Sequence, residues 1–306
     1  MTKEIYSQED LIQFKNLQHL AYQTVQLVQA ELRVGMTEIE AAGLIEAKLK
    51  SNGITQYFHR GFAWFGDRTR FKNFSMPLDF KSDKNIEENG FLQKLKRFSP
   101  QVPLPHFGLE FMPSKRKLTP GMPVILDVAP VQNRLAADIG YSFSFGENLE
   151  VHQGIMNLKP FRSMILEMVQ AEKGLSEIYH SCDQYILDIG YENCHEIYPL
   201  GVLGHRIGRL PLNFLPKISL MGFPPQAFAF LTGHLGKSLF NGMANKSPFW
   251  TSKNKNNAEV GLWAIEPHIG KGDVGVKFEE ILVIDESKAY WLDDDLPHVK
   301  YWNTQE

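Results

Sequence analysis

The chain has 306 residues, of which 43% are hydrophobic, enough for a sizeable buried core. Its net charge of −3 provides no positive field for nucleic acid or for an anionic membrane. No stretch approaches the ~20 apolar residues that span a bilayer, and the charged N-terminus lacks the apolar core of a signal peptide. The two cysteines, Cys182 and Cys194, form no CxxC pair. We therefore expect free thiols in a reducing cytoplasm.

The first predicted elements are two helices. Residues 8–33 form a long amphipathic stretch. A second helix is predicted to begin at Thr37, whose side chain would form a capping box with Glu40, and Gly53 suits its C-terminal end.

A similar order of elements follows the middle of the chain. Residues 150–172 form a second long amphipathic stretch, and the next helix is predicted to begin with Ser176 as N-cap and to end at Gly190. This repetition predicts two pseudo-symmetric halves around a joint sheet. The alternative is two unrelated helical hairpins that share common capping chemistry.

Two aspartates stand on either side of a predicted turn. An apolar run ends in Asp127, polar turn residues follow, and the chain returns to Asp138 and an alternating strand pattern. Such a hairpin could place both carboxylates at one end of the sheet. The alternative is a pair of turn aspartates that face water.

Three more polar residues occur in apolar settings further along the chain. His205 stands between two glycines, which allow close approach to a ligand. Glu266 ends an apolar run, and Glu279 lies inside an apolar strand, where a carboxylate is costly unless it is paired or bound to a cation. The alternative for Glu279 and Glu280 is an edge strand with outward-facing charges.

The five residues Asp127, Asp138, His205, Glu266 and Glu279 together offer four carboxylates and one imidazole. This ligand set suits a pair of divalent cations held close together, whereas a structural zinc site would require thiolates. The sequence therefore indicates a two-metal hydrolase.

The order of these motifs resembles the pita-bread metallopeptidases, the family of methionine aminopeptidase, prolidase, aminopeptidase P and the metal-free creatinase. The motifs are two aspartates eleven residues apart, then GHxIG, IEP and VxxEE, and the resemblance covers nearly the whole chain. It implies an α+β pita-bread fold with two pseudo-symmetric halves around a curved antiparallel sheet.

The resemblance also implies how metal ions would be held. Asp127 would bind one ion, His205 and Glu266 would bind the other, and Asp138 and Glu279 would bridge the two. The ions would be manganese, cobalt, iron or zinc, since carboxylate-rich sites accept several metals.

The resemblance to these metallopeptidases further implies catalysis by a metal-activated water. Glu266 would relay the proton to the leaving nitrogen, and His106 would form a hydrogen bond with the carbonyl or the leaving group. Two positions depart from the family pattern. Leu212 stands where family peptidases commonly carry a second histidine, and Tyr141 stands where an arginine is often found. His234 or His268 could compensate.

We expect one domain over residues 1–306, with insertions at about 67–105 and 218–260. Long segments without periodicity are usually functional or disordered. The second insertion would form a lid or pocket wall, or a contact between two copies of the chain in a homodimer. Its aromatic residues Phe223, Phe228 and Phe230 would enclose a substrate side chain, or would pack against the body of the protein.

The predicted function is hydrolysis of an amide or peptide bond, similar to that of Xaa-Pro peptidases or aminopeptidases, on a small peptide or amide. Two alternatives stay open at this point. One is a hydrolase of a non-peptide C–N bond in a small amide or guanidino compound, and the other is a non-catalytic peptide-binding protein.

Overall fold

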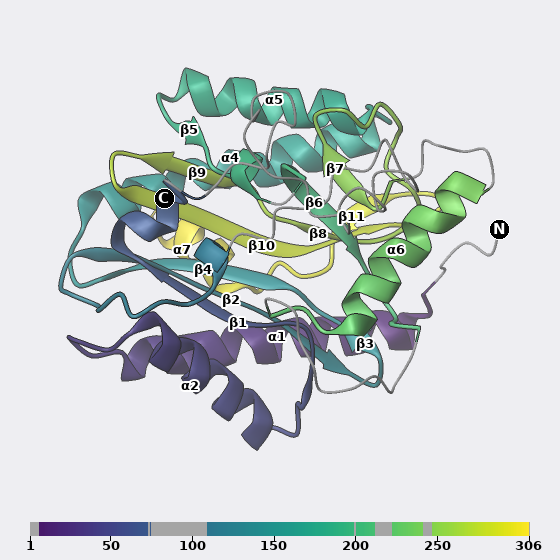
Figure 1. The fold of residues 1–306 in the computed structure, drawn as a ribbon. Helices are drawn as coiled ribbons and strands as arrows, with labels where there is room; N and C mark the ends of the chain where they lie inside the picture. Colours follow the sequence, from purple (N-terminus) through teal and green to yellow (C-terminus); the bar gives the residue numbers. More distant parts are fainter. Residues whose placement is uncertain are drawn as a thin grey trace, which may run out of the picture.

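The computed structural model describes residues 6–72, 74, 109–198, 200–211, 222–240 and 247–305. Its central feature is a curved antiparallel sheet with the strand order β1-β2-β4-β10-β8-β6-β7 (Figure 1). The strands of this path are β1 (Gln56–Phe65), β2 (Met122–Gln132), β4 (Ile139–Phe145), β10 (Val274–Ile284), β8 (Gly261–Ile265), β6 (Val202–Ile207) and β7 (Phe249–Thr251). Beside it lie β3 (Leu135–Ala136), β5 (Glu192–Asn193), β9 (His268–Lys271) and β11 (Ala289–Trp291).

Four of the helices form two similar groups on the sheet. The helices are α1 (Gln8–Glu31), α2 (Glu38–Ser51), α4 (Leu149–Gln170), α5 (Leu175–Asp188), α6 (Pro225–Phe240) and α7 (Pro297–Thr304). In the first half, α2 packs on β1 and α1 on β2 and β4; in the second half, α4 packs on β10 and α5 on β7. The two helix groups lie on either side of the sheet strands in the view of Figure 1. The predicted pita-bread architecture with two αβ halves is confirmed.

The helix ends agree with the predictions at three of four positions. Thr37 and Glu40 form the expected capping box at the start of α2. Gly53 and Gly190 follow α2 and α5 in the left-handed conformation, with φ of 80° and 73°. The prediction of Ser176 as N-cap of α5 is wrong, because Gly174 is the N-cap and Ser176 already lies inside the helix. The Ser176 backbone N–H instead donates to the carbonyl of Asn254.

The strand that carries Glu279 is central rather than peripheral. β10 pairs with β4 on one side and with β8 on the other, and all of its residues are buried. The alternative of an edge strand with outward-facing charges is therefore wrong. Charged side chains on β10 must find partners inside the protein.

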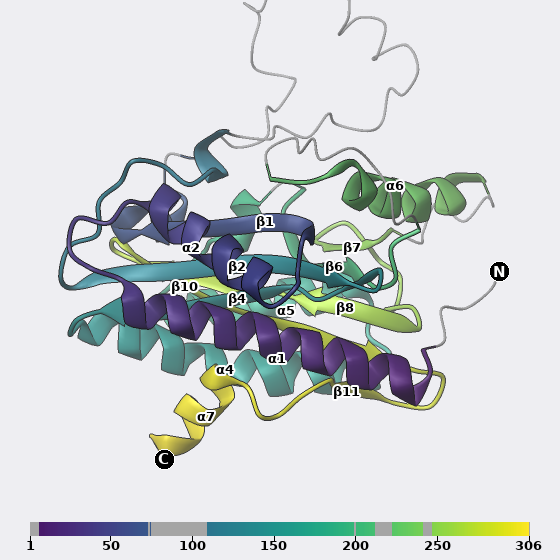
Figure 2. The ribbon, with the colours of Figure 1, turned by 90° about the horizontal axis from the view of Figure 1, so that it is seen from below.

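Alternation along the strands separates the two faces of the sheet. Leu126 and Val128 belong to the main core with α1, whereas Ile125 belongs to a second cluster. That second cluster is aromatic and contains Phe62, Trp64, Phe71 and Tyr198. In Figure 2 the sheet lies between α1 and α4 on one side and α6 on the other. Asp127 lies two residues after Ile125 in β2, so both side chains point to the same face of the sheet. The carboxylate of Asp127 therefore lies on the face opposite α1.

The two predicted insertions are described only in part. Residues 66–70 form a 3-10 turn, and the described portion of 218–260 contains α6 and β7. No helix within the described ranges is both long and apolar enough to cross a membrane.

Candidate metal centre

The side chains of all five predicted ligands converge on one buried cluster, although they come from separate segments. Asp127 lies on β2, His205 on β6 and Glu279 on β10, while Asp138 immediately precedes β4 and Glu266 immediately follows β8. The four carboxylates are 0–7% exposed. So many buried carboxylates require cations among them, because like charges cannot stay close together uncompensated.

Asp138 lies between two histidines. Its Oδ1 is 2.8 Å from Nε2 of His59, and its Oδ2 is 3.3 Å from Nε2 of His205. His205 Nε2 also lies 3.7 Å from Oε1 of Glu279, and His59 Nε2 lies 3.3 Å from Oδ1 of Asp127. The two imidazoles thus connect all of the carboxylates except Glu266.

The other ring nitrogen of each histidine fixes its orientation. His59 Nδ1 is 2.8 Å from the carbonyl of Arg60, and His205 Nδ1 is 3.0 Å from the carbonyl of Arg206. A carbonyl oxygen only accepts, so each Nδ1 carries the proton and each Nε2 faces Asp138. In that orientation Nε2 either carries a second proton or offers its lone pair to a metal ion.

The largest departure from the predicted centre is Lys277, whose ammonium lies inside the cluster. Its Nζ donates to Oδ2 of Asp127 at 2.7 Å, to Oε2 of Glu266 at 2.9 Å and to Oε2 of Glu279 at 2.9 Å. The side chain is 1% exposed. Three of the five predicted ligands are therefore already paired with a cation that the protein itself supplies.

Burial and charge shift the proton affinities of these groups in opposite directions. Burial raises the pKa of Asp127 to about 6 and that of Glu266 to about 8, although the Lys277 ammonium counteracts the shift in both. Burial disfavours the charged form of Lys277, but Asp127, Glu266 and Glu279 hold its pKa well above the ordinary value. The lysine is therefore a permanent cation at neutral pH.

The Asp138 side of the cluster shows the same competition. Burial alone would lower the pKa of both histidines, but the neighbouring Asp138 raises that of His59 to about 9 and that of His205 well above its usual range. Burial would raise the pKa of Asp138, yet the two histidines hold it well below the ordinary value. Asp138 therefore stays ionised.

The donor atoms that Lys277 leaves available suit a divalent ion. Two groups of potential ligands lie with their donor atoms within 4.8 Å of one another: His59, Asp127 and Asp138, and Asp138, His205 and Glu279. Oδ2 of Asp138 is buried and makes no regular hydrogen bond among the described residues, but lies 3.3 Å from Nε2 of His205. The second group offers one imidazole nitrogen, from His205, and two carboxylate oxygens, from Asp138 and Glu279. These are ligands that manganese, iron, cobalt and zinc accept.

Two members of the cluster, His59 and Lys277, were not predicted from the sequence. His59 precedes Arg60 in the strand after α2, just as His205 precedes Arg206 in the corresponding strand of the other half, so the internal repeat contained a signal for it. Lys277 lies two residues before Glu279 and therefore on the same face of β10. A lysine in so apolar a strand needs acidic partners when it is buried.

The remaining sequence-predicted positions have different outcomes. His106 and Leu212 lie outside the described residues. Tyr141 points to the helix side, where its ring meets that of Tyr22 edge-on at 6.3 Å, so it does not contact the cluster. His268 is buried on β9 in register with Lys277 of β10, and its Nδ1 lies 3.2 Å from the hydroxyl of Tyr198.

Aromatic residues of the 218–260 segment border the two histidines. Phe230 is 4% exposed and packs edge-on against Phe58, whose ring stacks on His205 at 5.6 Å. Phe223 is partly exposed, and its ring lies 5.4 Å from that of His59. Phe230 thus packs in the core, whereas Phe223 lies beside the cluster.

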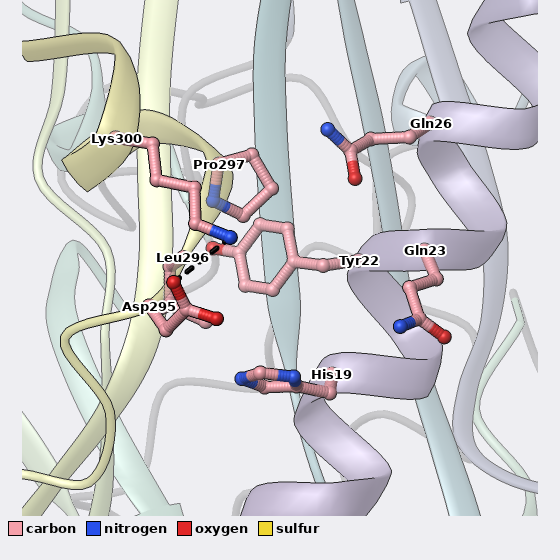
Figure 3. Close-up of a pocket in the computed structure, with 8 residues that line it drawn as sticks. All are labelled: His19, Tyr22, Gln23, Gln26, Asp295, Leu296, Pro297 and Lys300. Carbon is pink, nitrogen blue, oxygen red and sulfur yellow. Dashed lines mark ion pairs between the residues drawn. The ribbon is translucent and has the colours of Figure 1, made fainter. Parts of the chain in front are cut away.

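A separate cavity of about 150 Å³ lies between α1 and the start of α7 (Figure 3). Its walls include His19, Tyr22 and Gln26 of α1, and Lys300, which forms an ion pair with Asp295 at 2.8 Å. The hydroxyl of Tyr22 donates to the backbone carbonyl of Glu279 from the helix side. The cavity therefore lies on the other side of the sheet from the carboxylates.

The fold and the cluster together define a pita-bread protein with a carboxylate-rich centre. The chain belongs to metallopeptidase family M24, whose family model matches residues 13–286. Comparison with curated proteins gives no match.

Solved structures with the same fold include several peptidases. The chain is similar to the X-Pro aminopeptidase of Thermotoga maritima MSB8, with 17% identity and a TM-score of 0.62 over 97% of this chain and 64% of that one. It is similar to the prolidase of Pyrococcus furiosus, with 17% identity and a TM-score of 0.61 over 95% of this chain and 65% of that one. For the methionine aminopeptidase of Rickettsia prowazekii the identity is 12% and the TM-score 0.57, over 95% and 99% of the two chains. The chain thus spans less than two thirds of the first two relatives.

Proposed function

We propose that this chain is a metal-dependent hydrolase that cleaves the amide or peptide bond of a small substrate. The observation that supports the proposal most directly is the group of Asp138, His205 and Glu279, whose potential donor atoms lie within 4.8 Å of one another in a member of a metallopeptidase family. The names of the similar structures favour peptides, including Xaa-Pro peptides, as substrates.

A divalent ion bound there, whether manganese, cobalt, iron or zinc, would supply Lewis-acid polarisation of a carbonyl and activation of water. The chain's own residues would do the rest. The backbone carbonyl of Arg206 fixes the ring of His205, so that Nε2 faces the ion site. The backbone of Glu279 is anchored by the hydroxyl of Tyr22.

Glu266 is the proposed proton carrier. It is the carboxylate of the cluster that lies outside both potential ion groups. Lys277 holds one of its oxygens at 2.9 Å, which fixes the direction of the carboxylate. In this position Glu266 would accept a proton from the attacking water and deliver it to the leaving nitrogen. His106 is the proposed hydrogen-bond partner of the carbonyl or leaving group.

One observation favours a second candidate, a non-catalytic peptide-binding protein. Lys277 neutralises part of the negative charge of three carboxylates without any metal ion. A centre that is stable without metal could serve binding alone. Hydrolysis of a small non-peptide amide or guanidino compound is the third option, and the same assay separates the three.

The test is turnover by the purified chain with added Mn²⁺ on dipeptides, Xaa-Pro peptides, small amides and guanidino compounds, with released amine as the readout. Product that requires the ion and disappears in Asp138→Ala supports the hydrolase. Asp273→Ala, an exposed aspartate in the turn before β10, is the matched control and should behave as the wild type. Peptide binding by calorimetry without any product would instead favour the binding protein.

The two free and buried cysteines support the proposal of a reducing cytoplasmic location. We also propose that the 218–260 segment borders the substrate, because Phe223 lies beside His59. A homodimer contact is the alternative use of this segment, and the molar mass in solution, measured by light scattering, tests it.

A further inference from the structure

We propose that Lys277 is a built-in cation that replaces one of two divalent ions, so that the centre holds a single ion at Asp138, His205 and Glu279. This inference rests on the metal binding in the proposed function but not on hydrolysis. It replaces the expectation that all five predicted ligands bind a pair of ions.

The hydrogen-bond capacity of the ammonium is the first argument. A lysine ammonium has three N–H donors, and Lys277 directs its donors to Asp127, Glu266 and Glu279 at 2.7–2.9 Å. Each of these contacts has the length of a charge-assisted hydrogen bond. A metal ion that shared these three oxygens would have to displace the ammonium.

The surroundings of Lys277 are shaped for its side chain. Gly140 on the neighbouring strand β4 leaves room for it, since a Cβ at that position would be 2.3 Å from Cε of Lys277. The ring of Tyr198 lies 5.2 Å from the ammonium, a cation–π distance. The hydroxyl of Ser142 donates to the carbonyl of Lys277 and accepts from its N–H, which fixes the backbone.

The remaining donor atoms define one complete ion site. His205 Nε2 lies 3.3 Å from Oδ2 of Asp138 and 3.7 Å from Oε1 of Glu279, and these carboxylate oxygens do not contact Lys277. His59 is closer to Asp138, at the 2.8 Å of a charge-assisted hydrogen bond. His59 is therefore assigned as the hydrogen-bond partner of Asp138, and His205 as the metal ligand.

Charge balance agrees with this assignment. The cluster holds four carboxylates, namely Asp127, Asp138, Glu266 and Glu279. Two divalent ions would balance four negative charges. The Lys277 ammonium already brings one positive charge into the cluster, so that a second divalent ion would give a buried site more positive than negative charge.

The experiment counts the ions. The wild type and variants are loaded with excess Mn²⁺, desalted and assayed for Mn²⁺ per chain by elemental analysis. Electron paramagnetic resonance then distinguishes an isolated Mn²⁺ from a spin-coupled pair. We expect one isolated ion in the wild type and two coupled ions in Lys277→Met. The exposed Lys271 supplies the matched control, Lys271→Met, which should hold one ion.

Gly140→Ala is a second variant that keeps every charged group. Its methyl group would collide with Cε of Lys277 and push the flexible end of that side chain out of the cluster. We expect it to bind more Mn²⁺ than the wild type, so the test does not depend on the folding of Lys277→Met alone.

Two coupled ions in the wild type would overturn the inference while leaving the hydrolase proposal intact. An unchanged single ion in both folded variants would also overturn it. One ion in the wild type and two in Lys277→Met, without turnover of any substrate, would support the inference and contradict the hydrolase.

Discussion

Glu279 and Glu280 are neighbours on β10 and are both buried, yet their side chains lie on opposite faces of the sheet. Glu279 accepts from Lys277 inside the carboxylate cluster. Glu280 accepts from Nε of Arg162 at 2.8 Å, and its Oε1 lies 3.2 Å from Nε2 of His298. One carboxylate thus belongs to the site and the other connects β10 to α4 and α7.

This relationship predicts opposite phenotypes for two adjacent substitutions. Glu279→Ala should lose bound metal and turnover while remaining folded, because removing one of several crowded carboxylates relieves repulsion. Glu280→Ala should keep its metal but lose about 1–3 kcal/mol of stability, because Arg162 loses its buried partner and keeps only the exposed carboxylate of Asp294 and a backbone carbonyl. Elemental analysis and urea unfolding measure the two effects, and equal metal loss in both variants would contradict the assignment.

The two histidines should also differ. His205→Ala is expected to lose the bound ion, because it removes the only imidazole from the group of Asp138, His205 and Glu279. His59→Ala should retain an ion, since it removes a partner of Asp138 Oδ1 and Asp127 Oδ1 but no member of that group. Calorimetric titration with Mn²⁺ on both proteins checks this. Loss of the ion from His59→Ala alone would place the site at His59, Asp127 and Asp138 instead.

Lys277 should matter most for stability when no metal is present. Lys277→Met leaves three buried carboxylates without their shared cation, which should cost about 3–5 kcal/mol in the presence of a chelator. Added Mn²⁺ should restore more stability to this variant than to the wild type, since binding to the folded state stabilises it. Urea unfolding with and without Mn²⁺ is the measurement. A variant as stable as the wild type in chelator would show that the ammonium is dispensable.

The aromatic residues of the 218–260 segment should separate into two roles. Phe230→Ala should lower the free energy of unfolding by about 3–5 kcal/mol, the usual cost of removing a buried phenylalanine. Phe223→Ala should change KM or substrate preference with little loss of stability, because its partly exposed ring lies beside His59. Steady-state kinetics on two cleaved substrates, together with metal content, tests this. Unchanged kinetics in Phe223→Ala would show that this ring does not line the substrate pocket.

Both cysteines should resist modification in the native protein. Burial raises the pKa of the Cys194 thiol to about 12 and that of Cys182 further, so neither forms appreciable thiolate at pH 8. A chromogenic disulfide reagent should react slowly with the folded chain and rapidly with both thiols in denaturant, because the thiolate is the nucleophile. Fast reaction of either thiol in the folded protein would contradict the burial of these residues.

The sequence by itself determined features that depend on neighbouring residues. The capping box of Thr37 and Glu40, the glycines after α2 and α5, and the antiparallel pairing of the strands that carry Asp127 and follow Asp138 all have local causes. The convergence of the carboxylates could be anticipated because each ended or interrupted an apolar strand, where an ionised group needs a partner.

Only the tertiary structure decided which cations meet those carboxylates. Nothing near Lys277 in the chain indicates that its ammonium reaches Asp127, which is 150 residues away in sequence. His59 likewise meets Asp138 across 79 residues. The position of β10 between β4 and β8 brings Lys277 into the cluster, and the order β1-β2-β4 brings His59 to Asp138. No local pattern distinguishes a central strand from an edge strand. A charged side chain acquires its role from the charges that other strands bring to it, because electrostatic interactions depend on distance and burial and not on separation along the chain.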